Sequence, residues 1–195
     1  MTEQHKQAEA HQHEADSATF RIGDRTAEFP VLRATEGADA VDISTFMKQT
    51  GYTTLDQGFV NTSSTKSAIT YIDGANGILR YRGYPIEELA SKSSFLEVAY
   101  LLLYGQLPTE SEYESFTDRI RHHTLLHEDL KRFFTALPPH AHPMSVLSSA
   151  VNALSTYYED SLDVHNPEMV EQSTIRLLAK IPVIAAYAHK KSIGQ

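Results

Sequence analysis

The sequence predicts a mainly α-helical fold preceded by a small antiparallel β region. Three observations carry this prediction. Two segments near the amino terminus combine β-branched and aromatic residues around glycine-containing turns, which is typical of hairpins. From residue 84 onward, apolar residues recur at spacings of three and four, which is the period of a helix. Helix-capping patterns precede two of these helical segments.

By composition the chain divides into three parts. Residues 1–17 are polar and rich in His, Gln and Glu, so they bury too little apolar surface to offset ordering entropy, and we expect disorder. Residues 18–83 form the small β-rich region, and residues 84–195 form the helical part. The histidines of the tail could bind a metal weakly, although a solvated tail is the simpler interpretation: His5, His11 and His13.

Two hairpins are expected in the β-rich region. Within residues 18–33, ATFRI and AEFPVL flank the turn Gly23-Asp24. Within residues 67–82, AITYI and ILRYR are separated by DGANG, and its Asp-Gly and Asn-Gly pairs supply the positive φ values of a tight turn. Between the hairpins, residues 38–50 are expected to form a short helix. Residues 53–66, rich in Thr and Ser and containing Gly58, are expected to form a loop or an edge strand.

The helical part begins with clear start and stop signals. Pro85 suits the first turn of a helix. Ser94 and Glu97 form a capping box, in which each side chain satisfies the backbone N–H of the other residue. Gly105 is expected to end the helix that this box opens.

Further helices follow with their own signals. TESE at residues 109–112 is a second capping box. Helices are expected from about His127 to Leu137 and over residues 144–158. In the last helix, Asn166 is the cap and Pro167 the first residue.

The last helix carries apolar residues on nearly every face between Ile175 and Tyr187. Such a helix has to be surrounded by other elements. We therefore expect more polypeptide to belong after Gln195. The longest apolar stretch is broken by charged residues and by a proline, and it is too short to span a bilayer.

Composition limits the function classes. The net charge of −8 and the pI of about 5.6 argue against nucleic acid as a partner, because phosphate binding needs a basic surface. Without cysteine there is no disulfide, no thiolate nucleophile and no Cys-based zinc site. The first residues have no apolar core of a signal peptide, and a cytoplasmic protein is expected.

The residues alone reveal no active site. No phosphate-binding glycine loop, nucleophile elbow or HExxH motif occurs. His122, His123 and His127 cluster, and on one helix the last two would be four residues apart, a possible metal pair. A polar helix junction is the simpler interpretation. His140 and His142 could be ligands or bases, although we favour His142 as a helix cap.

Five segments, in order and at matching spacing, resemble the citrate synthase family. They are ITYIDGANGILRYRGYPIEELA (69–90), FLEVAYLLLYGQLPT (95–109), RHHTLLHEDLKRFF (121–134), HPMSVLSSAVNALSTYYEDSLD (142–163) and TIRLLAKIPVIAAYAHKKSIGQ (174–195). The resemblance covers roughly residues 18–195. It implies that residues 84–195 are the first part of the family's large helical domain. The amino-terminal β segment resembles the bacterial type, which implies a homo-oligomer, a dimer or a hexamer.

The resemblance also implies a reaction. The family condenses acetyl-CoA with oxaloacetate and water to give citrate and CoA, with no cofactor beyond these substrates. The family's catalytic motifs, such as His-Gly-Gly-Ala-Asn, lie beyond the point that matches Gln195, so we assign no catalytic residue and expect this span alone to be inactive. Two alternatives stay open: a 2-methylcitrate synthase that uses propionyl-CoA, and a non-catalytic helical interaction or regulatory module.

One functional site of the family falls inside the span. Some bacterial members bind NADH allosterically through basic and aromatic residues, and six residues here match by motif position: His122, His123, Thr124, Tyr158, Arg176 and Lys180. NADH-sensitive members have Arg where His122 stands, and a neutral His supplies less charge. Arg176 and Lys180, four residues apart on a helix, could face one pyrophosphate. The alternative is that they form structural ion pairs.

Overall fold

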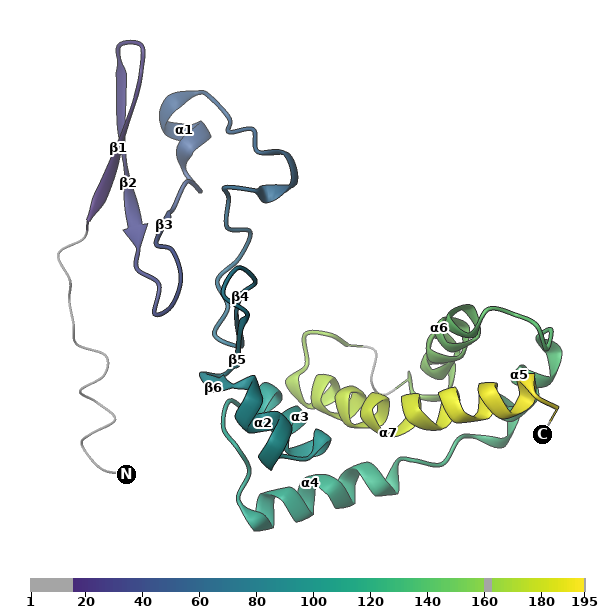
Figure 1. The fold of residues 1–195 in the computed structure, drawn as a ribbon. Coiled ribbons are helices and arrows are strands. Elements are labelled where there is room, and N and C mark those ends of the chain that lie inside the picture. Colours follow the sequence, from purple (N-terminus) through teal and green to yellow (C-terminus); the bar gives the residue numbers. More distant parts are fainter. Residues whose placement is uncertain (1–15, 160–162, 195) are drawn as a thin grey trace. The chain divides into compact units, whose positions relative to one another are not determined.

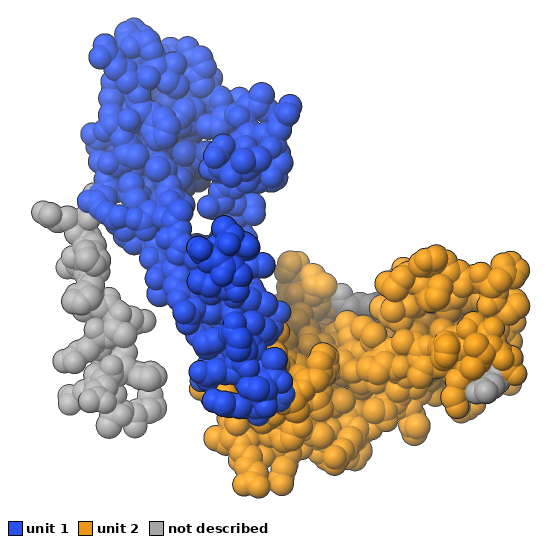
Figure 2. All heavy atoms as spheres, viewed as in Figure 1, with its two compact units in different colours: residues 1–93 blue, residues 94–195 orange. Residues whose placement is uncertain are grey.

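The computed structural model describes residues 16–159 and 163–194. These residues form two compact units: the first ends at Ser93 and the second begins at Ser94 (Figure 2). Figure 1 shows the strands and short helices of the first unit and the longer helices of the second. Most of the tail that we expect to be disordered lies outside the described residues, as do its three histidines. Ser17 already belongs to the first strand.

The first predicted hairpin is confirmed. β1 (Ser17–Ile22) pairs antiparallel with β2 (Arg25–Leu32), and β2 also pairs with the two-residue strand β3 (Ala40–Val41). The turn between β1 and β2 contains Gly23 with a φ of 63°, which a residue without Cβ adopts at little cost.

The helix predicted over residues 38–50 is much shorter than expected. α1 spans only Phe46–Thr50 and ends at Gly51, whose φ of 79° closes it. The preceding residues are in β3 instead, where Val41 lies opposite Val31. The reason is that pairing with β2 satisfies backbone groups there that a helix would have used internally, and local periodicity does not reveal such pairing.

An aromatic cluster holds the first sheet against α1. The rings of Phe20, Phe29 and Phe46 lie with centroids 5.3–5.6 Å apart. Phe29 is almost fully buried, at 1% exposure. Arg25 donates from a guanidinium nitrogen to the backbone oxygen of Thr50, at 2.8 Å, and so ties β2 to the end of α1.

The segment after α1 is mostly loop, as expected, with one 3₁₀ turn. This turn, η3 (Gln57–Phe59), contains two successive residues with positive φ, Gly58 at 76° and Phe59 at 56°. The carboxylate of Asp56 accepts the backbone N–H groups of Val60 and Asn61 and so closes the turn.

The second predicted hairpin is also confirmed. β4 (Thr70–Asp73) pairs antiparallel with β5 (Ile78–Tyr81), which pairs with β6 (Tyr84–Pro85). α2 (Ile86–Lys92) follows directly. The prediction for Pro85 was wrong by one position: it is the extended residue before the helix, with ψ of 141°, rather than part of the first turn.

Two capping boxes open the first helices of the second unit, as predicted. α3 (Phe95–Tyr104) begins after Ser94, and α4 (Glu110–His122) begins after Thr109, and in each box both reciprocal hydrogen bonds are present. Gly105, with a φ of 87°, ends α3.

Three more helices complete this unit: α5 (Glu128–Ala136), α6 (Pro143–Leu154) and α7 (Pro167–Ser192). The 3₁₀ turn η4 (Ser155–Tyr157) extends α6. A side chain accepts a backbone N–H at the start of each helix: His127 for α5, His142 for α6 and Asn166 for α7. No helix of the described residues is long and apolar enough to cross a membrane.

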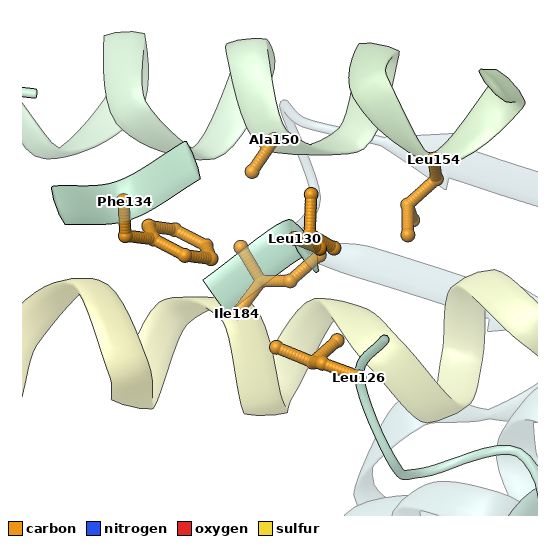
Figure 3. Packing of buried hydrophobic residues seen from close by; sticks show 6 residues of the cluster. All are labelled: Leu126, Leu130, Phe134, Ala150, Leu154 and Ile184. Atoms are coloured by element: carbon orange, nitrogen blue, oxygen red, sulfur yellow. The ribbon is translucent and has the colours of Figure 1, made fainter. Parts of the chain in front are cut away.

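α7 takes part in both apolar clusters of the second unit. One cluster brings together α5, α6 and α7 with the loop before α5 (Figure 3), and its buried members are Leu126, Leu130, Phe134, Ala150, Leu154 and Ile184. The other joins α4 to α7, and its buried members are Phe116, Ile120, Ile175 and Ala179. Pro182 lies inside α7, between the residues that serve the two clusters.

Candidate functional site

The candidate effector residues come from three elements of the second unit. His123 is the residue at which α4 ends, and Tyr158 is the residue after η4. Arg176 and Lys180 lie one turn apart on α7, as their spacing predicts. The structure brings these four side chains into one cluster, which we call the cation cluster.

Lys180 is the buried centre of the cation cluster. Its side chain is among the largest fully buried ones of the described residues, at 2% exposure. The ammonium donates to the backbone oxygen of His123 at 2.7 Å and to that of Leu125 at 2.6 Å. It also lies 5.3 Å from the ring centroid of Tyr158. Burying an ammonium without such partners would be costly, so the two carbonyl groups stabilise its position.

Arg176 shares the same aromatic ring. Its guanidinium carbon lies 4.4 Å from the ring centroid of Tyr158, within the range of a cation–π interaction. One tyrosine ring therefore lies close to two cations of α7. The arrangement concentrates positive charge at this point of a chain whose net charge is negative.

His123 is held neutral by its surroundings. Burial lowers its pKa below the ordinary 6.5, and the nearby charges of Arg176 and Lys180, and more weakly of Arg119, lower it further. Its Nε2 lies 3.2 Å from the amide nitrogen of Gln172. An amide nitrogen can only donate, so Nε2 accepts and carries no proton.

His122 and Thr124 make their hydrogen bonds with α4. His122 is exposed, and its Nδ1 lies 2.8 Å from the backbone oxygen of Asp118. The hydroxyl of Thr124 donates to the backbone oxygen of Arg121 at 2.9 Å.

The possible metal pair at His123 and His127 assumed one continuous helix, and this assumption was wrong. α4 ends at His122, and His127 caps the next helix by accepting the N–H of Asp129 at 3.2 Å. Its ring packs on that of Tyr157, with centroids 4.8 Å apart. Within residues 16–159 and 163–194, no group of three or more potential ligands could hold a metal ion.

The interpretation of His142 as a helix cap is confirmed. Its Nδ1 accepts the backbone N–H of Met144 at 3.2 Å, at the start of α6. Pro143 then occupies the first turn, where its missing N–H costs nothing.

A polar network around Glu171 was not predicted from the sequence. Glu171 on α7 accepts from a guanidinium nitrogen of Arg119 on α4 at 2.6 Å and from the hydroxyl of Tyr104 on α3 at 3.0 Å. The hydrogen bond from Arg119, followed by that from Tyr104, lowers the pKa of Glu171 below 4.5. Glu171 lies 52 positions after Arg119 and 67 positions after Tyr104. No local sequence signal pairs residues so far apart, so spacing could not predict this network.

Residues 58–195 match the family model described as citrate synthase, C-terminal domain. Citrate synthase 1 of Mycobacterium tuberculosis is 59% identical over 180 residues, which are 92% of this chain and 42% of that protein. Citrate synthase of Corynebacterium glutamicum is 50% identical over 167 residues, 86% of this chain and 38% of that protein. The chain thus spans well under half the length of these relatives.

Two solved structures share the fold. The citrate synthase from Thermotoga maritima matches with a TM-score of 0.62 and 34% identity, over 73% of this chain and 36% of that one. The citrate synthase from Pyrobaculum aerophilum matches with a TM-score of 0.63 and 37% identity, over 70% of this chain and 36% of that one. The mainly helical fold with a small antiparallel β region is therefore confirmed.

Proposed function

This chain belongs to the citrate synthase family, and on that premise we propose that it is part of an enzyme that condenses acetyl-CoA with oxaloacetate and water to give citrate and CoA. The observation that carries the proposal is the 59% identity to Mycobacterium tuberculosis citrate synthase 1 across 92% of the chain. The helical framework common to this chain and two solved citrate synthases supports it.

This span supplies framework rather than reacting groups. The polar side chains of the second unit mostly cap helices or join them: His127 and His142 cap α5 and α6, while Glu171 ties α3 and α4 to α7. Lys180 is occupied by two backbone carbonyl groups. We therefore place the groups that bind and convert the substrates in the part of the relatives that this chain does not cover.

A chimera tests this division of labour. The 195-residue chain is fused to the part of Mycobacterium tuberculosis citrate synthase 1 that lies beyond its matched 42%, and release of free CoA from acetyl-CoA and oxaloacetate is followed with a thiol reagent. The chimera should release CoA only when both substrates are present. The chain alone and the relative's remaining part alone are the controls, and neither should do so.

Two results would contradict the proposal. Release of CoA by the chain alone would place reacting groups within these residues. A folded chimera without activity, beside an active intact relative, would exclude the chain as a working framework.

The same assay separates the alternatives. Replacing acetyl-CoA by propionyl-CoA tests 2-methylcitrate synthesis, and a chimera that prefers propionyl-CoA would favour that reaction. The non-catalytic module predicts a stable, monodisperse chain that adds nothing to the relative's remaining part. The exposed apolar side chains along α7 count against that module, because Val170, Leu177 and Ile181 are 38–45% exposed.

We further propose that the complete protein works in the cytoplasm as a homo-oligomer, a dimer or a hexamer. Light scattering of the active chimera measures its mass directly. A monomer that retains full activity would contradict the oligomeric part of the proposal.

A second candidate function is the binding of an anionic nucleotide such as NADH at the cation cluster. The observation in its favour is that Arg176 and Lys180 both lie against the ring of Tyr158. Their charges also add to the burial that lowers the pKa of His123. The hydrogen bonds of Lys180 to two backbone carbonyl groups count against it, because they use donors that a pyrophosphate would need.

Titration of NADH against the protein, followed by NADH fluorescence, tests this candidate. Arg176→Gln should weaken binding about tenfold, the size of one lost charged hydrogen bond. Arg132→Gln removes the same charge from an 83% exposed side chain on α5 and should leave binding unchanged. If NADH does not bind saturably, or if Arg176→Gln and Arg132→Gln weaken its binding equally, the cation cluster has a purely structural role.

A further inference from the structure

The turn between β4 and β5 contains the one Asn-Gly pair of the chain. The last paired residues of the two strands are Asp73 and Ile78, and the turn between them includes Asn76 and Gly77, which are both exposed. Gly77 has a φ of 68°, and no heavy atom lies within 4 Å of the position that a Cβ would occupy. No other part of the described chain therefore crowds Gly77 on the side of its Cα where a side chain would be.

We propose that Asn76 is a site of non-enzymatic deamidation, in which the side chain reacts with the backbone nitrogen of Gly77. The nitrogen loses its proton to water and attacks Cγ of Asn76, so a new N–C bond closes a five-membered succinimide. The bond between Cγ and Nδ2 of Asn76 breaks, and Nδ2 takes up a proton and leaves as ammonia. Water then adds to either carbonyl carbon and opens the ring to aspartate or isoaspartate.

The other three asparagines of the chain are less suited to this reaction. Asn61 precedes Thr62, whose β-branched side chain crowds the backbone nitrogen. Asn152 lies inside α6, where the helix fixes the backbone. Asn166 precedes Pro167, which has no N–H to lose. Asn76 combines a glycine successor with an exposed turn outside helices and strands.

The carboxylate of Asp73 restrains the reacting side chain. One of its oxygens accepts the backbone N–H groups of Ala75 and Asn76, each at 3.1 Å, and the other accepts from Nδ2 of Asn76 at 2.7 Å. These hydrogen bonds lower the pKa of Asp73, so the acceptor is charged at neutral pH. Because Nδ2 must leave during the reaction, this hydrogen bond has to break first, and Asp73 slows the modification.

The product disturbs the turn that formed it. A new carboxylate at position 76 replaces an amide whose nitrogen lies 2.7 Å from the carboxylate of Asp73, so an attraction becomes a repulsion between like charges. Isoaspartate also lengthens the backbone of the turn by one carbon. The modification is therefore expected to loosen the β4–β5 hairpin and to make the net charge one unit more negative than −8.

Timed incubation of the purified protein at mildly alkaline pH, followed by tryptic peptide mapping with mass spectrometry, tests the proposal. Cleavage after Lys66 and Arg80 gives the peptide of residues 67–80, in which Asn76 is the sole asparagine. This peptide should gain the deamidation mass and split into aspartate and isoaspartate forms before any peptide with Asn61 or Asn152 changes. Equal or slower change at Asn76 would overturn the proposal.

Asp73→Ser tests the restraint while keeping a hydroxyl that can accept the backbone N–H groups of the turn. In the folded protein this substitution should speed deamidation of Asn76 several-fold. In synthetic peptides of residues 67–80 the same substitution should have little effect, because the unfolded peptide does not hold the two side chains together. An unchanged rate in the folded variant, with a hairpin shown intact by circular dichroism, would exclude control by Asp73.

Discussion

The ammonium of Lys180 on α7 donates a 2.7 Å hydrogen bond to the backbone oxygen of His123, a residue 57 positions earlier in the chain. The same ammonium donates to Leu125, so the non-helical link between α4 and α5 is fastened to α7 from inside the second unit. Lys191 makes a similar contact at the other end of α5, where it donates to the backbone oxygen of Leu137 at 2.7 Å. Two lysines of one helix thus bond to the backbone on either side of α5.

Lys180→Met should lower the free energy of unfolding by roughly 2–4 kcal/mol, because two part-buried carbonyl oxygens lose a charged donor. Urea unfolding followed by helical circular dichroism measures the change. Lys190→Met, an exposed substitution in the last turn of the same helix, should cost less than about 1 kcal/mol. Equal stability of the Lys180 variant and the wild type would show that the two hydrogen bonds are not stabilising.

His123 should make stability depend on pH. The unfolded chain takes up a proton at this position near pH 6.5, whereas the lowered pKa keeps folded His123 neutral to lower pH. The unfolded state therefore binds more protons below pH 6.5, so this contribution to stability is complete above 6.5 and is lost as the pH falls toward the lowered pKa.

His123→Gln should flatten the pH dependence of the unfolding free energy between about pH 7 and pH 5, because Gln does not titrate. Urea unfolding at a series of pH values provides the measurement. His165→Gln, at an exposed position outside the cation cluster, is the control and should leave the slope unchanged. A slope that persists in the His123 variant would assign the pH dependence to another group.

Leu130→Ala should cost about 2–5 kcal/mol of unfolding free energy, because Leu130 is fully buried among α5, α6 and α7 and its truncation leaves a cavity. Leu125→Ala, five residues earlier, removes a side chain that is 84% exposed and should change stability by less than about 0.5 kcal/mol. Comparable losses in the two variants, measured by urea unfolding, would contradict the assigned core.

Ser94→Ala should cost about 1 kcal/mol, because it removes the side-chain acceptor of the capping box that opens α3. Ser115→Ala replaces an exposed serine inside α4, where alanine is the better helix former, and should be neutral or slightly stabilising. Ser94→Ala should thus lower the melting temperature and Ser115→Ala should not, so thermal unfolding of the two variants distinguishes a cap from ordinary helix propensity.

Where residues signal their structure locally, sequence reasoning located the elements closely. Ser94, Thr109 and Asn166 each precede a helix and cap it, and Gly105 ends one. The DGANG turn lies between β4 and β5 as its residue types require. These signals act within four residues, so no knowledge of the fold was needed to read them.

The elements that sequence reasoning did not locate depend on contacts with residues far away in the sequence. Residues 38–50 did not form one helix, because Val41 pairs with Val31 across the first sheet. α4 did not continue beyond His122, because the carbonyl groups of His123 and Leu125 accept hydrogen bonds from Lys180 instead of from a further helical turn. A lysine within the apolar run of α7 was a visible anomaly, but spacing alone could not identify what it binds.

For the candidate site, too, spacing predicted neighbours on one helix but not contacts between distant residues. The spacing of Arg176 and Lys180 correctly put both on one helix, and the structure adds that Tyr158 lies beneath them. The resemblance selected these residues together with His122 and Thr124, whose hydrogen bonds go to α4. Whether the six residues bind a nucleotide stays a prediction that the titration with NADH addresses.

The proline inside α7 has a consequence for how the second unit loses its structure. α7 supplies Ile175 to one apolar cluster and Ile184 to the other, so neither cluster can persist when the helix melts. Pro182 has no N–H for the carbonyl group four residues earlier, which makes its surroundings the weakest turn of the helix. The two clusters are therefore expected to unfold as one cooperative unit, with hydrogen exchange starting from that turn.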